Sequence, residues 1–167
     1  QLTEIFIIQN IRRHNAEKIM MCDSGQVSPM HYHENKREDI INRGGNDVVF
    51  TFYNADQSKV HRTEDGRNIY EKDLVNDVLI YRDGRQYKVK AGEPVRIHNG
   101  ESITLVPFQY HEFIIPEGGP ALIGEVSMVN DDHTDNFFYE PLGRFPTIEE
   151  DEPAYRLLCT EYPAAKD

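Results

Sequence analysis

Two histidines separated by one residue, His31 and His33, constrain this chain more than any other feature. In an extended strand, side chains at i and i+2 point to the same face, so both imidazoles would point the same way. Glu38 follows after a stretch that lets the chain bend and return a carboxylate to the same point. Two imidazoles and one carboxylate form a divalent-metal site that can keep positions open for a substrate. The run therefore predicts a site built for chemistry.

Strand signals dominate the rest of the sequence. Short aromatic and β-branched runs, such as 48–53 and 78–81, recur at roughly 8–12-residue spacing between turns that contain Gly or Asn. Residues 82–85 predict a hairpin turn, the polar stretch 54–76 predicts a loop or an extra hairpin, and 155–162 predict a last strand. The pattern as a whole is typical of an all-β sandwich or barrel.

Composition excludes several classes of partner. The net charge of −11 argues against nucleic acids and anionic membranes, since phosphate contacts need clusters of Lys and Arg. No apolar run approaches the ~18 residues that span a membrane, and no signal peptide is visible. Cys22 and Cys159 form no C-x-x-C pair, so we expect reduced thiols in a cytoplasmic protein.

The length of 167 residues predicts a single domain over 1–167. The first residue is Gln1 rather than Met, and the residues after it already have the pattern of a strand. We therefore expect that a longer parent chain has an N-terminal segment before Gln1.

A fourth ligand is expected from a second turn and strand, residues 100–111, which end at His111. His111 has the same strand–turn–strand context as His31 and His33, so three histidines and Glu38 would converge inside a barrel. The remaining four histidines lack this context and are expected to face solvent: His14, His61, His98 and His133. For His133, a place at the edge of the pocket is the alternative.

The spacing of these residues resembles the first motif of the cupin superfamily. All five motif positions are filled, by Gly25, His31, His33, Glu38 and Gly45. The second motif is looser, because Gly100 and His111 hold while Phe108 stands at the expected Gly and Val106 at the expected Pro. The resemblance implies an all-β cupin domain, a double-stranded β-helix or jelly-roll barrel, and the departures put the shape of the second turn in question.

Several longer sequence segments resemble the D-lyxose isomerase family of cupins. They cover nearly the whole chain, at 30–33, 36–45, 124–127, 129–132 and 150–153. The resemblance implies Mn2+ as the bound metal, although imidazole and carboxylate ligands also suit Co2+, Zn2+ or Fe2+. It implies interconversion of D-lyxose with D-xylulose and of D-mannose with D-fructose, and an N-terminal helical extension as in several members. Cupin barrels often pair through edge strands, so a homodimer is also expected.

An isomerase of this type moves a proton between C1 and C2 of the sugar through a cis-enediol. A divalent metal stabilises the negative charge that develops on oxygen, and four protein ligands on an octahedral ion leave two positions for two sugar oxygens. The route also needs a base and an acid. Glu125 is the candidate base because it interrupts an apolar strand and so would face the interior; the alternative is a surface glutamate.

Lys36 lies between two predicted ligands, and we expect it to act in catalysis and to bind a sugar hydroxyl; the alternative is a solvated lysine. Asp131 and Arg144 are further candidates for binding sugar hydroxyls. The alternative for Asp131 is a role in a turn, and the alternative for Arg144 is an ion pair with the acidic run at 149–152. Arg43 is expected to brace its turn.

Three alternatives stay open. A metal-mediated hydride shift would perform the same reaction with less dependence on Glu125. A cupin dioxygenase with Fe2+ and O2 would share the three-histidine site, although the polar candidates around it suit a polyol better: Lys36, Glu125, Asp131 and Arg144. A non-catalytic cupin would bind a sugar or retain a metal without turnover. Ketose formation, oxygen consumption or neither would separate these functions.

Overall fold

The computed structural model describes residues 15–63, 66–129, 134–140, 152, 153 and 155, together with the backbone of 3–7; the side chain of His61 is excepted. Apart from Tyr155, the expected last strand at 155–162 lies outside these residues, and it includes Cys159. Residues 1 and 2 also lie outside them. All regular structure in the described part is β-strand. No helix there has the length and apolar character that crossing a membrane requires.

The strands follow one another with short connections. Their bounds are β1 (Thr3–Ile7), β2 (Asn15–Cys22), β3 (Val27–Tyr32), β4 (Glu38–Gly45), β5 (Val48–Arg62), β6 (Asn68–Asp73), β7 (Val78–Arg82), β8 (Arg85–Val89), β9 (Val95–Ile97), β10 (Ser102–Leu105), β11 (Gln109–Ile114), β12 (Ala121–Met128) and β13 (Phe137–Phe138).

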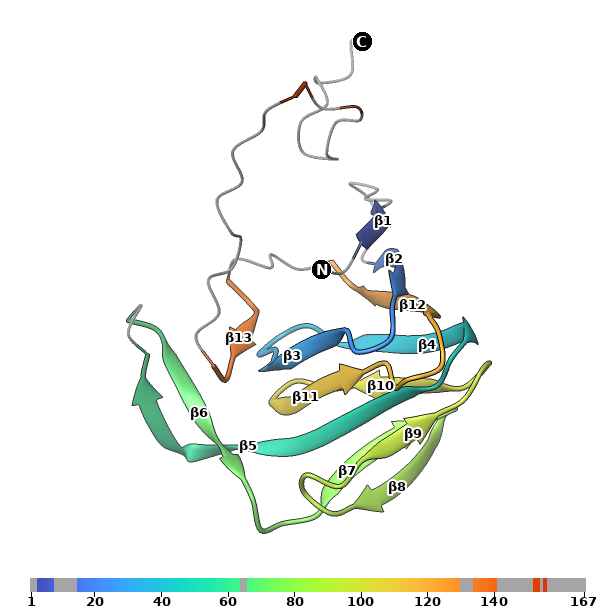
Figure 1. Ribbon diagram of the computed structural model, residues 1–167. Helices are drawn as coiled ribbons and strands as arrows, with labels where there is room; N and C mark the ends of the chain where they lie inside the picture. Colours follow the sequence, from blue (N-terminus) through green and yellow to red (C-terminus); the bar gives the residue numbers. More distant parts are fainter. Residues whose placement is uncertain are drawn as a thin grey trace.

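Two antiparallel sheets curl around a common interior (Figure 1). One sheet has the order β1-β2-β12-β4-β10-β7-β8, and the other has the order β13-β3-β11-β5-β6 with β9 paired to β5. Strands far apart in sequence are therefore neighbours: β12 lies between β2 and β4, and β11 lies between β3 and β5. These crossovers are those of a jelly roll. The predicted all-β cupin fold is confirmed.

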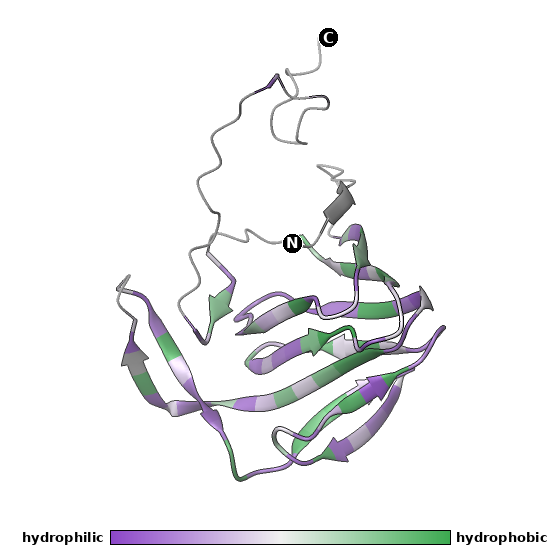
Figure 2. Ribbon diagram, viewed as in Figure 1, coloured by the Kyte–Doolittle hydropathy of each residue, from purple (hydrophilic) through white to green (hydrophobic). Residues whose placement is uncertain are grey.

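The core lies between the two sheets, where inward side chains alternate with outward ones. Along β2 exposed and buried residues alternate strictly, as the pleat of a strand requires. Apolar positions recur along β4 and β5 in Figure 2. Phe50 and Phe52 of β5 are fully buried, with ring centroids 5.5 Å apart, and pack in one cluster with Ile103 and Ile123 of the facing sheet. Burial of each such side chain stabilises the fold by about 1.5–3 kcal/mol.

The polar stretch 54–76 forms the extra hairpin rather than a loop. β5 continues to Arg62 and pairs with β6 through a bulge between Asp56 and Val60. The predicted hairpin turn at 82–85 is also present, because Asp83 and Gly84 have φ values of 50° and 72°. Two consecutive positive φ angles match the twist of a two-residue hairpin.

Candidate metal centre

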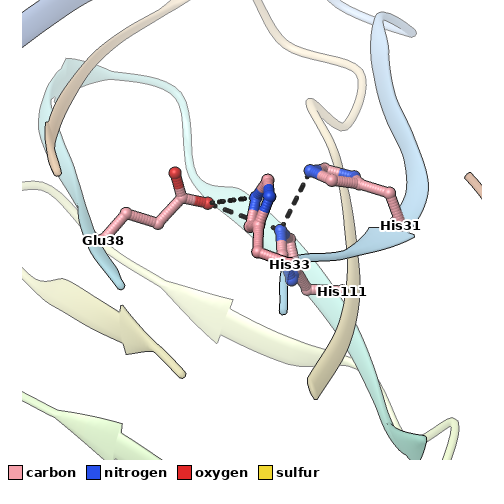
Figure 3. Close-up of side chains that lie close together, drawn as sticks. All are labelled: His31, His33, Glu38 and His111. Atoms are coloured by element: carbon pink, nitrogen blue, oxygen red, sulfur yellow. Dashed lines mark hydrogen bonds and ion pairs between the residues drawn. The ribbon is translucent and has the colours of Figure 1, made fainter. Parts of the chain in front are cut away.

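Four side chains from three strands and one turn converge at one end of the interior (Figure 3). His31 ends up beside His111 because β3 and β11 pair antiparallel with these two residues in register. His33 follows two positions later, and Glu38 opens β4 after the chain reverses. One ligand atom from each lies within 4.8 Å of the others, and all four residues are buried. The structure thus brings together the four residues that the sequence predicted as ligands.

Each imidazole of the cluster directs Nδ1 at a backbone carbonyl. Nδ1 of His31 lies 2.6 Å from the oxygen of Pro29, Nδ1 of His33 lies 2.5 Å from the oxygen of Asp135, and Nδ1 of His111 lies 2.9 Å from the oxygen of Gln109. Because a carbonyl oxygen only accepts, Nδ1 carries the proton in all three rings. In the neutral imidazole, Nε2 then presents a lone pair.

Burial keeps the rings of His31 and His111 neutral. Burial, and next to it the neighbouring His111 and His33, hold the pKa of His31 well below its ordinary value. Burial also lowers the pKa of His111, although Glu38 opposes the shift. Protonation of Nε2 is therefore disfavoured in His31 and His111, and the lone pairs of these two atoms remain available.

The lone pairs point at one another. Nε2 of His31 and Nε2 of His111 lie 3.1 Å apart, and Oε1 of Glu38 lies 3.4 Å from Nε2 of His111 and 3.5 Å from Nε2 of His33. Nε2 of His33 has no hydrogen-bond partner in the described part of the chain. Three lone pairs and a carboxylate repel unless a cation lies among them, so the cluster suits a metal ion with nitrogen and oxygen ligands.

A second group of buried charges adjoins the cluster. Nζ of Lys36 lies 2.5 Å from Oε2 of Glu38 and 3.2 Å from Oε1 of Glu125. Nζ of Lys18 lies 3.2 Å from the same oxygen of Glu125. Because β12 turns Glu125 inward, this residue is 6% exposed, and Lys36 is 5% exposed. Neither residue is the solvated surface group that was its alternative.

The environment of Glu125 alters its acidity in opposite directions. Burial and the negative charge of Glu38 raise the pKa of Glu125, while Lys36 and Lys18 oppose the shift, and the net direction is upward. A carboxyl group with a raised pKa holds a proton more readily than an ordinary glutamate does, which suits a residue that accepts and returns a proton.

The turn before His111 has the backbone of a glycine although Phe108 occupies it. Phe108 has a φ of 59°, in the left-handed region. Its N–H donates to the carbonyl of His33 at 2.8 Å, and its carbonyl accepts from the N–H of Ala55 at 2.9 Å. These bonds to His33 and to β5 hold the turn in place, although Phe108 and Val106 stand where the cupin motif has Gly and Pro.

Sequence reasoning missed several side chains at the site. Lys18 interrupts the inward apolar face of β2, and this break was the signal that could have found it. Ser127, two residues after Glu125 on the same face, is 4% exposed, and its Oγ has no partner in the described residues. A depression of about 300 Å³ borders Glu38 and Ser127 where β4 begins and β12 ends. Phe138 of β13 places its ring centroid 5.3 Å from that of His31.

Other predicted residues lie elsewhere. Asp131 and Arg144 are outside the described residues, as are His14 and His133. His98 is exposed, as predicted, and its Nδ1 lies 2.9 Å from a carboxylate oxygen of Asp47. The guanidinium of Arg43 contacts Glu17 of β2 at 3.3 Å and lies over Gly124 of β12, so its contacts among the described residues are with neighbouring strands and not with the turn that it was expected to brace.

A family model and two curated relatives match most of this chain. The family model described as D-lyxose isomerase matches residues 7–162. The D-lyxose/D-mannose isomerases of Escherichia coli O157:H7 and Serratia proteamaculans are 47% and 49% identical over 148 residues, which is 88% of this chain. The chain spans about 60% of the length of each of these relatives.

Two solved structures are similar to the chain. The L-ribose isomerase of Cellulomonas parahominis with L-ribose has a TM-score of 0.48 at 17% identity, over 74% of this chain and 57% of that one. The L-ribose isomerase of Acinetobacter sp. DL28 with L-ribose has a TM-score of 0.49 at 16% identity, over 74% and 58%.

Proposed function

The chain belongs to the D-lyxose isomerase family, and from this premise we propose that it is a metal-dependent aldose–ketose isomerase. Its substrates are D-lyxose, converted to D-xylulose, and D-mannose, converted to D-fructose. The names of the two relatives support this choice of sugars. The observation that carries the proposal is the buried pair of Lys36 and Glu125 directly beside the cluster of three histidines and Glu38.

In this proposal His31, His33, Glu38 and His111 hold the metal through three Nε2 atoms and a carboxylate oxygen. The ion is Mn2+, as the family resemblance implies, with Co2+, Zn2+ or Fe2+ as replacements that the same ligand types accept. When bound, the ion would supply Lewis acidity that stabilises negative charge developing on the sugar.

Glu125 moves the proton. Its carboxylate takes the proton from C2 of the aldose and returns it to C1, while the hydroxyl proton of O2 passes to O1, so the ketose has the same atoms as the aldose. The intermediate between these transfers is a cis-enediol. The raised pKa of Glu125 favours a carboxyl group that holds the proton for the lifetime of this intermediate.

Lys36 serves both binding and catalysis. Its ammonium lies between Glu38 and Glu125, and from there it donates to the sugar oxygen on which negative charge develops. Ser127 offers on the same interior face a hydroxyl that has no partner among the described residues. Asp131 and Arg144 complete the proposed set of hydroxyl-binding residues, and we further propose a cytoplasmic homodimer, to be tested by cell fractionation and light scattering.

The test is ketose formation by EDTA-treated protein, with D-lyxose and D-mannose, before and after addition of Mn2+. We expect D-xylulose and D-fructose only with added metal, and loss of at least ~100-fold in kcat for Glu125→Gln. The matched control is Glu112→Gln, which removes a carboxylate on the opposite face of β11 from His111. Tight Mn2+ binding without any ketose would overturn the choice of substrate.

The alternatives give different results in the same samples. A dioxygenase would consume O2 in the presence of Fe2+, and a sugar-binding cupin would bind D-lyxose without product. The hydride-shift route is separated by running the reaction in D2O. A proton held by the Glu125 carboxyl group exchanges in part with D2O before it reaches C1, so proton transfer leads to partial solvent deuterium in the ketose, whereas a hydride shift retains the original hydrogen completely.

A further inference from the structure

We propose that Asp135, which lies outside both cupin motifs, is a positioning residue for the metal centre. Its backbone carbonyl orients His33, and its carboxylate fixes the turn that carries Lys36. The effect on metal binding stands on geometry alone, and the effect on turnover rests on the proposed isomerase function.

The first contact, made by the backbone carbonyl of Asp135, orients the proposed ligand His33. Nδ1 of His33 donates to the carbonyl oxygen of Asp135 at 2.5 Å, and both groups are buried. This bond fixes the tautomer and the ring orientation that aim Nε2 of His33 at the other ligands. The two residues are 102 positions apart in sequence.

The second contact sets the turn between β3 and β4. Oδ1 of Asp135 accepts from the N–H of Glu34 at 2.7 Å and from that of Asn35 at 3.1 Å. Oδ2 accepts from the N–H of Lys36 at 2.8 Å and again from that of Asn35 at 3.3 Å. Three consecutive N–H groups thus bind one carboxylate, a concave arrangement that favours an anion. These bonds satisfy donors that the strands leave without partners.

This turn carries functional atoms at both ends. It begins after His33 and ends before Glu38, and it contains Lys36, whose ammonium reaches Glu38 and Glu125. A shift of the turn would therefore move two ligands and the proposed catalytic lysine together. Displacements of about 1 Å at such groups are large on the scale of catalysis.

The position of Asp135 is itself fixed by the strand that follows. Phe137 and Phe138 of β13 pair with Tyr32 and His31 of β3. The ring of Phe137 stacks on that of Tyr32, with centroids 4.9 Å apart and an interplanar angle of 12°. Asp135 is 5% exposed, so its carboxylate is held between β13 and the turn. Strand β13 thus fixes Asp135 against the turn between β3 and β4.

The experiment measures Mn2+ affinity by calorimetry on EDTA-treated protein, for wild type, Asp135→Ala and Asp135→Asn. Asp135→Ala keeps the backbone carbonyl that accepts from His33 but removes the carboxylate that binds the turn, so we expect displacement of the turn to weaken Mn2+ binding about 10–100-fold. Asp135→Asn keeps one acceptor oxygen but turns an N–H donor toward the amides, and we expect an intermediate loss. At saturating Mn2+ we expect kcat to fall at least ~10-fold with a smaller change in KM, because Lys36 is displaced.

The matched control is Asp73→Ala. Oδ1 of Asp73 accepts from the N–H of Val75 at 2.9 Å and from that of Asn76 at 3.1 Å, so it stabilises a turn of similar kind after β6. Mn2+ affinity should stay within about twofold of wild type, although the melting temperature falls. Unchanged affinity in both Asp135 variants, or an equal loss in Asp73→Ala, would overturn the inference. Weakened Mn2+ binding in a protein that forms no ketose would leave it standing and reject the isomerase.

Discussion

Phe108 has a left-handed backbone at the position where the cupin motif has glycine. A residue with a Cβ costs about 1–2 kcal/mol there relative to glycine. The ring offsets this strain through packing, since it stacks with Tyr32 at a centroid distance of 6.2 Å and lies 6.0 Å from Tyr70. The side chain that departs from the motif is thus part of an aromatic cluster outside the barrel interior.

This conflict between backbone and side chain predicts an unusual order of stability. Both Phe108→Ala and Phe108→Gly lose the ring, but only glycine relieves the strain, so Phe108→Gly should be the more stable by about 1 kcal/mol. Urea unfolding measures the difference. The control is buried Phe113 on β11, where Ala should be more stable than Gly. The same order at both positions would contradict the explanation.

Cys22 is fully buried, and its thiol should be almost unreactive in the folded protein. Burial, with a smaller contribution from the charge of Asp23, raises the pKa of Cys22 to about 11 from an ordinary 9.0. Since only the thiolate reacts, a shift of two pKa units slows disulfide-forming reagents about 100-fold at pH 8.

The measurement uses Cys159→Ser, in which Cys22 is the remaining thiol. Between pH 7 and pH 10 the reaction rate in the folded protein should rise about tenfold per pH unit, because this range lies below the raised pKa. In urea the rate should level off near pH 9. A folded protein that reacts as fast as the unfolded one would refute the assignment.

At the scale of elements, the two glycines that bound the first cupin motif have different tasks. Gly25, before β3, has a φ of 79° and nothing within 4 Å of where a Cβ would lie. Gly45, at the end of β4, has a φ of 87°, and a Cβ there would lie 2.3 Å from the carbonyl oxygen of Pro120. The first glycine serves only the turn, whereas the second also lets β4 approach β12 closely.

The alanine variants should therefore differ. Gly25→Ala introduces backbone strain of about 1 kcal/mol, while Gly45→Ala adds a steric clash with backbone and should cost about 3 kcal/mol or more. Urea unfolding of both variants under identical conditions checks the order. Equal losses would mean that the neighbourhood of Pro120 yields to the added methyl group.

At the scale of the whole molecule, the cluster of lone pairs links metal binding to stability. Without a cation, His31, His111 and Glu38 repel one another in a buried environment. Metal at 100 times its Kd stabilises the folded state by about 2.7 kcal/mol. For a domain of this size, this corresponds to a rise of roughly 5–10 °C in melting temperature.

Calorimetric melting of EDTA-treated protein with and without Mn2+ measures this rise. Glu38→Gln should abolish most of it, because the amide lacks the negative charge. The control is Glu101→Gln, which alters a carboxylate paired with Arg82 on the surface. A similar rise in all three proteins would show that Mn2+ binds at another place.

The sequence by itself determined the features that depend on local spacing. The i and i+2 relation of His31 and His33, the return of Glu38, and the alternation that predicts strands need only a few consecutive residues. Glu125 and Lys36 were also accessible, one because it breaks an apolar strand and the other because it lies inside the motif. The jelly roll followed from the motif and from many short strands.

Only the tertiary structure decided which distant residues complete the site. Glu125 meets Lys36 across 89 positions, and Asp135 reaches His33 across 102, through pairings of β12 and β13 that no local pattern encodes. Lys18 faces Glu125 because β2 and β12 pair in that register. A register is set by the packing of the whole core, since a slip of one residue would turn each side chain to the other face. Local spacing therefore predicts the ligands, while long-range strand pairing selects their partners.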